Sequence, residues 1–198
     1  YALKDVGRFR VNVFNQSRGL GAIFRIIPKT VPSIDSLSLP NGIRKLLEHQ
    51  NGLILVCGPT GSGKTSTLAA MVNEVNMNPN RSKHVITIED PVEFIHTPHH
   101  SVITQRQVGL HTESFSSALR SALREAPDVI VVGEMRDLET ISLALSAAET
   151  GTLVFGTLHT NSAAKAVDRI IDAYPDANRD QMRGSLSVLL RGVISQHL

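Results

Sequence analysis

The chain has 198 residues, of which 20 are Lys or Arg and 18 are Asp or Glu, so its formal charge at neutral pH is +2. A hydrophobic content of 41% with 19% charged residues supports one sizeable core and excludes disorder as the main state. The single cysteine excludes a disulfide framework or a multi-cysteine zinc site and favours a reducing compartment. Apolar runs are too short to cross a bilayer, and no block of Lys and Arg forms a phosphate track. We therefore predict neither membrane insertion nor nucleic-acid binding.

The first 32 residues are predicted to form part of a separate domain and its linker. Residues 8–14 alternate polar and apolar side chains, which predicts a half-buried strand with two arginines on one face. Residues 15–21 contain two glycines and predict a turn, and residues 22–27 predict the second strand of a hairpin. Residues 28–32 begin and end with proline, which predicts a stiff connector at the domain boundary.

Residues 33–198 alternate predicted strands with predicted helices. Apolar strands are expected at residues 53–57, 85–88, 129–132 and 153–158. Helices are expected at residues 43–49, 64–75, 114–125, 137–148 and 161–173, with Asn161 as a cap, and from Asn178 to the end of the chain. Such alternation implies a parallel sheet covered on both faces, with right-handed crossovers. The predicted fold class is therefore α/β, with an open, mostly parallel sheet.

The strongest chemical signal is GPTGSGKT at residues 58–65, which matches G-x-x-x-x-G-K-[ST] between a predicted buried strand and a predicted helix. Its glycines let backbone N–H groups surround a polyphosphate, and the helix adds the positive end of its dipole. Lys64 is expected to reach the β and γ phosphates, and the Thr65 hydroxyl to coordinate Mg²⁺. We therefore predict a site for ATP and Mg²⁺, with nucleotide contacts from Gly58, Pro59, Thr60, Gly61, Ser62, Gly63, Lys64, Thr65 and Ser66.

Two glutamates follow predicted strands of the same sheet. Glu89 directly follows residues 85–88, and Glu134 follows residues 129–132 after one intervening residue, Gly133. Ligands of open parallel sheets bind beyond the carboxyl ends of the strands, so both side chains are expected near the glycine loop. Gly133 occupies the position at which many P-loop enzymes carry the Walker B aspartate. Glu134 is therefore the available acid, and the sequence leaves open whether it acts on Mg²⁺ through water or polarises the attacking water.

Histidines occur at two places of interest. His159 follows the predicted strand at residues 153–158, where it is placed to sense or bond the γ-phosphate. His99 and His100 lack a third ligand at a suitable spacing, so we expect a surface loop there and no metal site. Cys57 precedes the glycine loop within an apolar strand and is expected to be a small buried hydrophobic residue.

With these residues in place, the chain resembles the bacterial secretion and motility ATPases of the type II/IV secretion-system family, and most closely their pilus-retraction branch. The resemblance covers essentially the whole chain. It uses four motifs: a Walker A at residues 58–65, an aspartate box at 87–93, a Walker B at 132–137 and a histidine box at 156–161. Gly133 is normal for the Walker B of this family.

The resemblance implies a homo-hexamer of two-domain subunits. Residues 1–32 would hold the last strands of a PAS-like domain and the linker, and residues 33–198 a RecA-like core truncated at its C-terminus. In this family Glu89 would be the catalytic base, Glu134 the acid beside Mg²⁺, and His159 a nucleotide-linked or interdomain contact. Arginines of the N-terminal hairpin would reach a nucleotide held by a core; the candidates are Arg8, Arg10 and Arg18.

The function implied by the resemblance is ATP-driven retraction of type IV pili, which underlies twitching motility. The protein would be cytoplasmic, peripheral to the inner membrane, and would act on a platform protein of the pilus in that membrane. Three alternatives stay open at this point: a pilus-extension or type II secretion ATPase, a nucleotide-binding scaffold with little turnover, and a nucleic-acid motor with the same core. The absence of a basic surface with interleaved aromatic residues disfavours the last.

Overall fold

The computed structural model describes residues 2–3 and 6–197, which contain two separate sheets. The smaller sheet is antiparallel and has the order β1-β2-β3, with β1 at Ala2–Leu3, β2 at Gly7–Gln16 and β3 at Gly19–Ile27. The predicted hairpin is confirmed, but the turn predicted over residues 15–21 is too long. Asn15 pairs with Leu20, and Gln16 pairs with Gly19, so the chain reverses over two residues.

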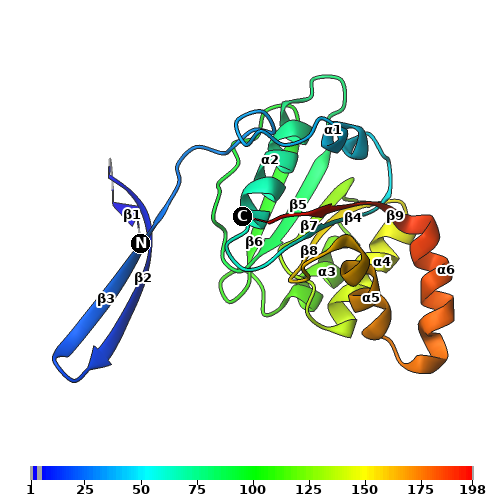
Figure 1. Ribbon diagram of the computed structural model, residues 1–198. Helices are drawn as coiled ribbons and strands as arrows, with labels where there is room; N and C mark the ends of the chain where they lie inside the picture. Colours follow the sequence, from blue (N-terminus) through cyan, green and yellow to red (C-terminus); the bar gives the residue numbers. More distant parts are fainter. Residues whose placement is uncertain (1, 4–5, 198) are drawn as a thin grey trace.

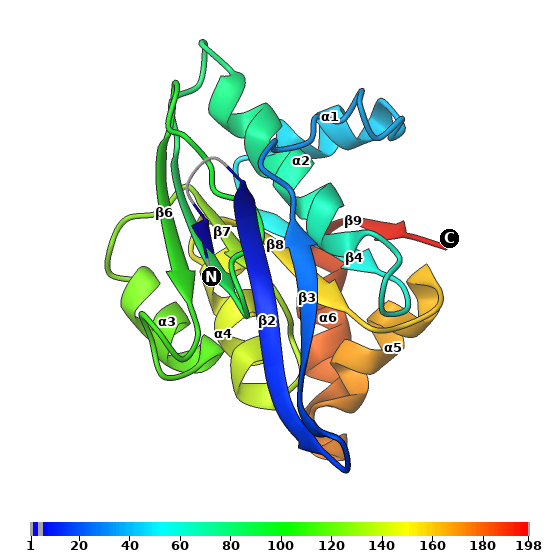
Figure 2. The same cartoon turned by 90° about the vertical axis from the view of Figure 1, so that its left-hand side faces the viewer.

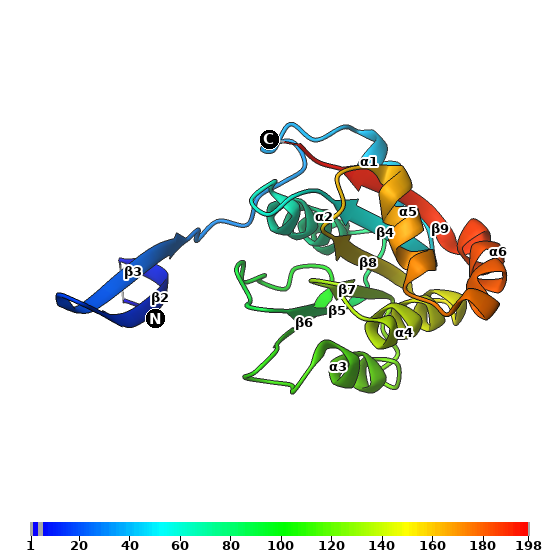
Figure 3. The same cartoon turned by 60° about the horizontal axis from the view of Figure 1, so that its bottom comes forward.

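The hairpin lies beside the larger unit on the side to which the carboxyl ends of the larger sheet point. Figures 1 and 3 show the strands β8, β4 and β9 aimed toward the hairpin, and Figure 2 shows the hairpin in front of the core when viewed from that side. Several large apolar side chains of the hairpin are exposed, including Phe24 at 64% and Ile26 at 73%. The assignment of this part to a PAS-like domain, and the boundary at residue 32, stay predictions.

The larger sheet has six parallel strands in the order β6-β5-β7-β8-β4-β9, which confirms the predicted α/β class. Its strands are β4 (Gly52–Cys57), β5 (His84–Glu89), β6 (Val102–Gln107), β7 (Val129–Val132), β8 (Leu153–Leu158) and β9 (Leu190–Ser195). Both edge strands, β6 and β9, are absent from the predicted elements. The helix predicted to run to the chain's end is wrong beyond Leu189, because Leu190–Ser195 pairs with β4.

Helices cover both faces of this sheet (Figures 1 and 3). One face carries α1 (Gly42–Leu47) and α2 (Lys64–Met77). The other face carries α3 (Phe115–Ala122), α4 (Leu138–Glu149), α5 (Ala163–Asp172) and α6 (Arg179–Leu189). A short 3₁₀ turn at Asp176–Asn178 precedes α6. Ser114 and Asp137, the first residues of two predicted helices, are the N-caps of α3 and α4. The cap predicted at Asn161 is wrong, because the Ser162 side chain accepts the Lys165 N–H. In the described ranges no helix is both long and apolar enough to cross a membrane.

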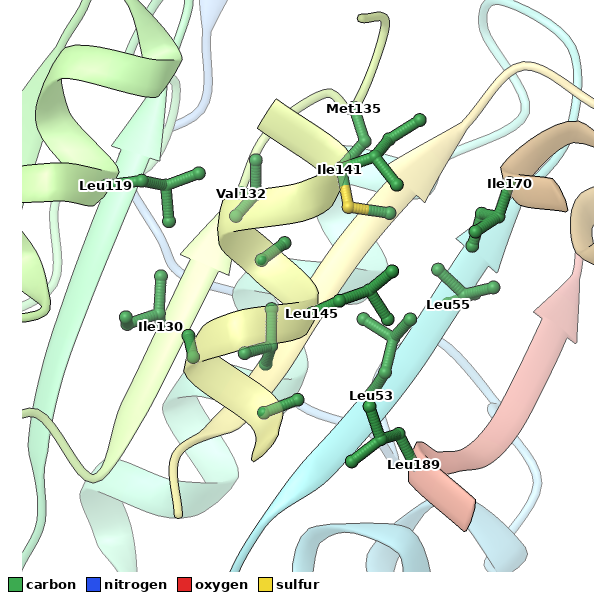
Figure 4. Packing of buried hydrophobic residues seen from close by; sticks show 14 of the residues in the cluster. Leu53, Leu55, Leu119, Ile130, Val132, Met135, Ile141, Leu145, Ile170 and Leu189 are labelled. Atoms are coloured by element: carbon green, nitrogen blue, oxygen red, sulfur yellow. The ribbon is translucent and has the colours of Figure 1, made fainter. Parts of the chain in front are cut away.

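The buried side chains form one cluster on each face of the sheet. Along β4, Leu53 and Leu55 belong to the cluster under α3–α6, whereas Ile54 and Val56 belong to the cluster under α2. Figure 4 shows the first cluster, in which Ile141 and Leu145 of α4 lie over the strands. A strand that is buried on both faces needs apolar residues at successive positions, which is why these strands have continuous apolar sequences. The two clusters hold the carboxyl ends of the strands in fixed positions.

Candidate functional site

A cleft of about 390 Å³ opens where β4, β5, β7 and β8 end. Its lining includes Lys64 after β4, Glu89 at the end of β5, Glu134 after β7 and His159 after β8. The structure therefore brings together four side chains that the sequence analysis selected separately. Their common feature is that each lies at the carboxyl end of a parallel strand, where ligands of open α/β sheets bind.

The loop between β4 and α2 depends on glycine at three positions. Gly58, Gly61 and Gly63 have φ angles of +152°, +83° and +88°, which side chains with a Cβ rarely adopt. A Cβ at Gly58 would also lie 2.5 Å from both the Gln196 carbonyl oxygen and the Ser62 Oγ. The backbone can thus form this tight loop only with the glycines of the motif.

Lys64 lies folded across this loop. Its Nζ donates hydrogen bonds to the carbonyl oxygens of Gly58 at 2.8 Å and Pro59 at 2.9 Å. Burial lowers the pKa of the Lys64 ammonium, and the nearby Glu134 carboxylate opposes this effect. The ammonium is held by carbonyl groups within the cleft, where a phosphate oxygen would be a stronger partner.

The polar groups of the loop fit a polyphosphate. The N-cap of α2 is Gly63, which provides no side-chain cap, so the first N–H groups of the helix are open to an anion. The Thr65 side chain lines the same cleft. Residues 2–3 and 6–197 contain no group of three or more ligating side chains that could hold a metal. Mg²⁺ takes most of its ligands from phosphates and water when it binds with a nucleotide, so the Thr65 hydroxyl and the Glu134 carboxylate would be sufficient protein ligands.

Glu89 is the last residue of β5, and its carboxylate is held by three donors. Its Oε1 accepts hydrogen bonds from the Thr87 hydroxyl at 2.6 Å and the Gln105 amide at 3.2 Å, and the backbone N–H of Glu93 is the third donor. Burial raises the pKa of the Glu89 carboxyl above its usual range, and these hydrogen bonds only partly offset the effect. A fixed carboxylate with a raised pKa is suited to accept a proton at neutral pH.

Glu134 and His159 form a second polar group in the cleft. The His159 Nε2 lies 3.0 Å from the Glu134 Oε1, which also pairs with Arg136. The other ring nitrogen, Nδ1, lies 3.5 Å from the Lys64 Nζ. Because an ammonium can only donate, a neutral ring with its proton on Nε2 satisfies both contacts. His159 therefore connects the lysine of the glycine loop to the acid that follows β7.

Gly133 lets the ends of β5 and β7 approach closely. Its N–H donates to the Ile88 carbonyl oxygen at 2.8 Å, and a Cβ at this position would lie 3.0 Å from that oxygen and 3.3 Å from the Glu89 Cα. An aspartate here would force the two strand ends apart. The glycine therefore permits the arrangement in which Glu89 and Glu134 lie on neighbouring strands.

The hairpin arginines lie in different surroundings. Arg8 donates to the carbonyl oxygens of Val92 at 3.1 Å and Glu93 at 3.2 Å, which joins the hairpin to the loop after β5. Arg10 and Arg18 are exposed, and Arg10 pairs in register with Arg25 of β3. Arg25, which the sequence analysis did not select, lines the cleft. Its position opposite Arg10 in the hairpin is the only sequence signal that could have identified it.

The remaining sequence expectations concern residues outside the cleft and the residues of the glycine loop. His99 and His100 lie on an exposed loop, and Cys57 is buried, as predicted. Thr60, Gly61, Gly63 and Ser66 line the cleft together with Lys64 and Thr65. Gly58, Pro59 and Ser62 do not line it but shape the loop.

These features define the P-loop class of nucleotide-binding proteins. The sheet is parallel, the glycine loop is followed by a lysine and a threonine at the start of a helix, and acids lie at neighbouring strand ends. The chain belongs to the type II/IV secretion system protein family, whose family model matches residues 6–198.

Individual relatives agree with this assignment. The chain is 56% identical to the twitching motility protein of Neisseria gonorrhoeae over 198 residues, which is all of this chain and 52% of that protein. It is 53% identical to the type IV pilus retraction ATPase PilT of Pseudomonas aeruginosa, again over the whole chain and over 57% of the relative. A crystal structure of the pilus retraction motor PilT with bound ADP superposes with a TM-score of 0.95 at 51% identity, covering 100% of this chain and 57% of that one. The chain thus spans little more than half the length of these relatives.

Proposed function

We propose that this chain is the ATP-hydrolysing part of a hexameric motor that powers the retraction of type IV pili. The observation that carries the proposal is the convergence of Lys64, Glu89, Glu134 and His159 on one cleft beside the glycine loop. The names of the relatives described above support pilus retraction over secretion or extension. In this proposal the motor lies at the cytoplasmic side of the inner membrane and acts on a platform protein there.

The glycine loop binds the phosphates of ATP. Backbone N–H groups of the loop and of the start of α2 surround the polyphosphate, and Lys64 exchanges its carbonyl partners for β and γ phosphate oxygens. The Thr65 hydroxyl and, through water, Glu134 would hold Mg²⁺. When bound, the ion neutralises negative charge that develops on the phosphates.

Glu89 acts as the general base. It takes a proton from a water molecule whose oxygen attacks the γ-phosphorus, while the bond from that phosphorus to the β–γ bridging oxygen breaks. ADP carries away the electrons of the broken bond, and the proton on Glu89 is released to solvent with phosphate. The half-buried position and raised pKa of Glu89 suit this role.

Hairpin arginines complete the site of a neighbouring subunit in the proposed hexamer. Arg10 and Arg18 are exposed, so they are available to a nucleotide in the next subunit, whereas Arg8 is engaged by its own core and Arg25 lines the cleft of its own chain. An arginine that stabilises the transition state from another subunit is worth about 10³ to 10⁵ in rate. Single substitutions of the hairpin arginines should therefore identify which of them acts.

The test uses the protein at its full natural length. We expect it to hydrolyse ATP, and we expect Lys64→Ala to lose nucleotide binding or turnover. Glu89→Gln should keep ATP binding and lose about 10²- to 10⁴-fold in kcat. Normal turnover in Glu89→Gln would remove this residue as the base, and a persistent monomer in ATP and Mg²⁺ by native mass measurement would contradict the hexamer.

Cells that carry Glu89→Gln in place of the natural protein distinguish retraction from extension. Loss of retraction leaves pili on the surface but abolishes twitching, whereas loss of extension removes the pili. We expect surface pili without twitching, and cells without pili would contradict a role in retraction.

A further inference from the structure

Gln105 lies behind Glu89, on the edge strand β6. In the parallel pairing of β5 with β6, Gln105 is the partner of Thr87, and Gln107 is the partner of Glu89. Side chains two residues apart on a strand share a face of the sheet, so the Thr87, Glu89, Gln105 and Gln107 side chains lie on the same face. This register brings the Gln105 amide to the carboxylate at the end of β5.

All the hydrogen-bonding groups of the Gln105 amide have partners at the site. Its Oε1 accepts the His96 N–H at 2.9 Å, and its Nε2 donates to the Phe94 carbonyl oxygen at 2.9 Å and to the Glu89 Oε1 at 3.2 Å. The N–H of His96 requires an acceptor and the carbonyl of Phe94 a donor, which determines the orientation of the amide. The NH₂ group is consequently directed at Glu89.

We propose that Gln105 is a positioning residue for hydrolysis, which holds Oε1 of Glu89 and the loop after β5 in a fixed arrangement so that the carboxylate faces the attacking water. Glu89 lines the cleft, whereas Gln105 does not, so Gln105 acts through Glu89 and does not touch the nucleotide. The proposal rests on the role of Glu89 as the base.

Gln107 provides a matched control. It lies two residues further along β6, on the same face, and its Oε1 accepts the Val92 N–H at 3.2 Å. It therefore holds the same loop as Gln105 does, but no hydrogen bond joins it to Glu89 among those of the described residues. A role limited to holding the loop predicts the same effect for both glutamines, and a role in positioning Glu89 predicts different effects.

The experiment measures ATP hydrolysis by the full-length protein with Gln105→Met or Gln107→Met. We expect Gln105→Met to lower kcat by about tenfold or more, with KM for ATP changed by less than about threefold, because only the chemical step is affected. In the pH profile of kcat/KM, the fall at low pH is the acidic limb. This limb should also move to higher pH, because Glu89 loses a donor that favours its charged form. Gln107→Met should leave kcat within about threefold of the unmodified protein and leave the limb in place.

Two results would overturn the proposal: normal kcat and an unmoved limb in Gln105→Met, or equal changes in both variants. ATP binding and thermal unfolding confirm that each variant is folded. If Gln105→Met does not fold, Gln105→Asn serves the same test, because its amide is one methylene too short to reach Glu89. The parallel variant Glu89→Gln separates the two proposals. If Glu89→Gln retains turnover, Glu89 is not the base, and Gln105 has no base to position. If Glu89→Gln is inactive while Gln105→Met has normal activity, only the positioning role of Gln105 is wrong.

Discussion

The imidazole of His159 lies 3.0 Å from the carboxylate of Glu134, and this pair joins the ends of two neighbouring strands. The backbone determines the pairing, because the Met135 N–H donates to the Thr157 carbonyl oxygen at 3.1 Å beside it. The same ring faces the Lys64 ammonium through its other nitrogen. A change at the Lys64 ammonium, where a phosphate would bind, can therefore reach Glu134 through the His159 side chain alone.

Replacing His159 should weaken this connection. Loss of a hydrogen bond to a charged group costs about 1.5–3 kcal/mol, which is roughly ten- to a hundredfold in kcat/KM if the contact is present in the transition state. We expect His159→Ala to show such a loss in steady-state ATP hydrolysis, and His100→Ala, on an exposed loop, to show none. Equal activity of the two variants would exclude His159 from the reaction.

The raised pKa of Glu89 predicts the pH dependence of hydrolysis. The base must be deprotonated, so kcat/KM should fall as pH decreases through a value above the ordinary 4.5 of a glutamate. The Thr87 hydroxyl donates to this carboxylate at 2.6 Å and lowers its pKa. Thr87→Val should therefore move the acidic limb to still higher pH. The measurement is kcat/KM between pH 5 and 8, and a limb that moves to lower pH in Thr87→Val would contradict the assignment.

Close packing at Gly133 predicts that even a methyl group is harmful there. Gly133→Ala places a Cβ 3.0 Å from the Ile88 carbonyl oxygen, so β5 and β7 must move apart at the site. We expect a loss of about 1–3 kcal/mol in the free energy of unfolding and reduced turnover, measured by urea unfolding and ATP hydrolysis.

Gly184→Ala is the control for this experiment. Gly184 lies within α6, and a Cβ there would meet nothing within 4 Å. That variant should gain about 0.5–1 kcal/mol from helix propensity and keep its activity. A Gly133→Ala variant as stable and active as Gly184→Ala would show that the strand ends do not need to be so close.

The central strands could be predicted because burial on both faces leaves a local sequence signal. The predicted strands at residues 129–132 and 153–158 agree with β7 and β8, which are wholly buried. The edge strands carry no such signal. β6 has the polar sequence TQRQ, and β9 contains Arg191 and Gly192 directly after a helix, so their conformation depends on pairing with β5 and β4, which are distant in sequence.

The same distinction explains which parts of the site can be predicted from the sequence. Lys64, Glu89, Glu134 and His159 each follow a recognisable strand, and the parallel topology brings such positions together. Gln105 and Arg25 could not be selected in this way. The contact of Gln105 with Glu89 requires the register of an unpredicted strand, and the position of Arg25 in the cleft requires the placement of the hairpin beside the core.

His96 predicts how the stability of the protein depends on pH. The residue is 8% exposed, and burial lowers the pKa of its ring from 6.5 to about 4. As pH falls below 6.5 the unfolded chain binds a proton that the folded chain does not bind, so the folded state loses stability. The contribution is fully present above pH 6.5 and is lost as pH falls through about 4. Between pH 7 and pH 5 it amounts to about 2 kcal/mol.

His96→Gln should remove this contribution, and the measurement is the free energy of unfolding in urea at the two pH values. The difference between pH 7 and pH 5 should shrink by about 2 kcal/mol relative to the unmodified chain. His99→Gln is the matched control, because His99 lies three residues further along the same loop with its side chain exposed, and its contact with Asn76 uses only the backbone N–H. We expect this variant to keep the full difference. If the two variants have the same pH dependence, the buried ring of His96 is not its source, because burial is the property in which the two histidines differ.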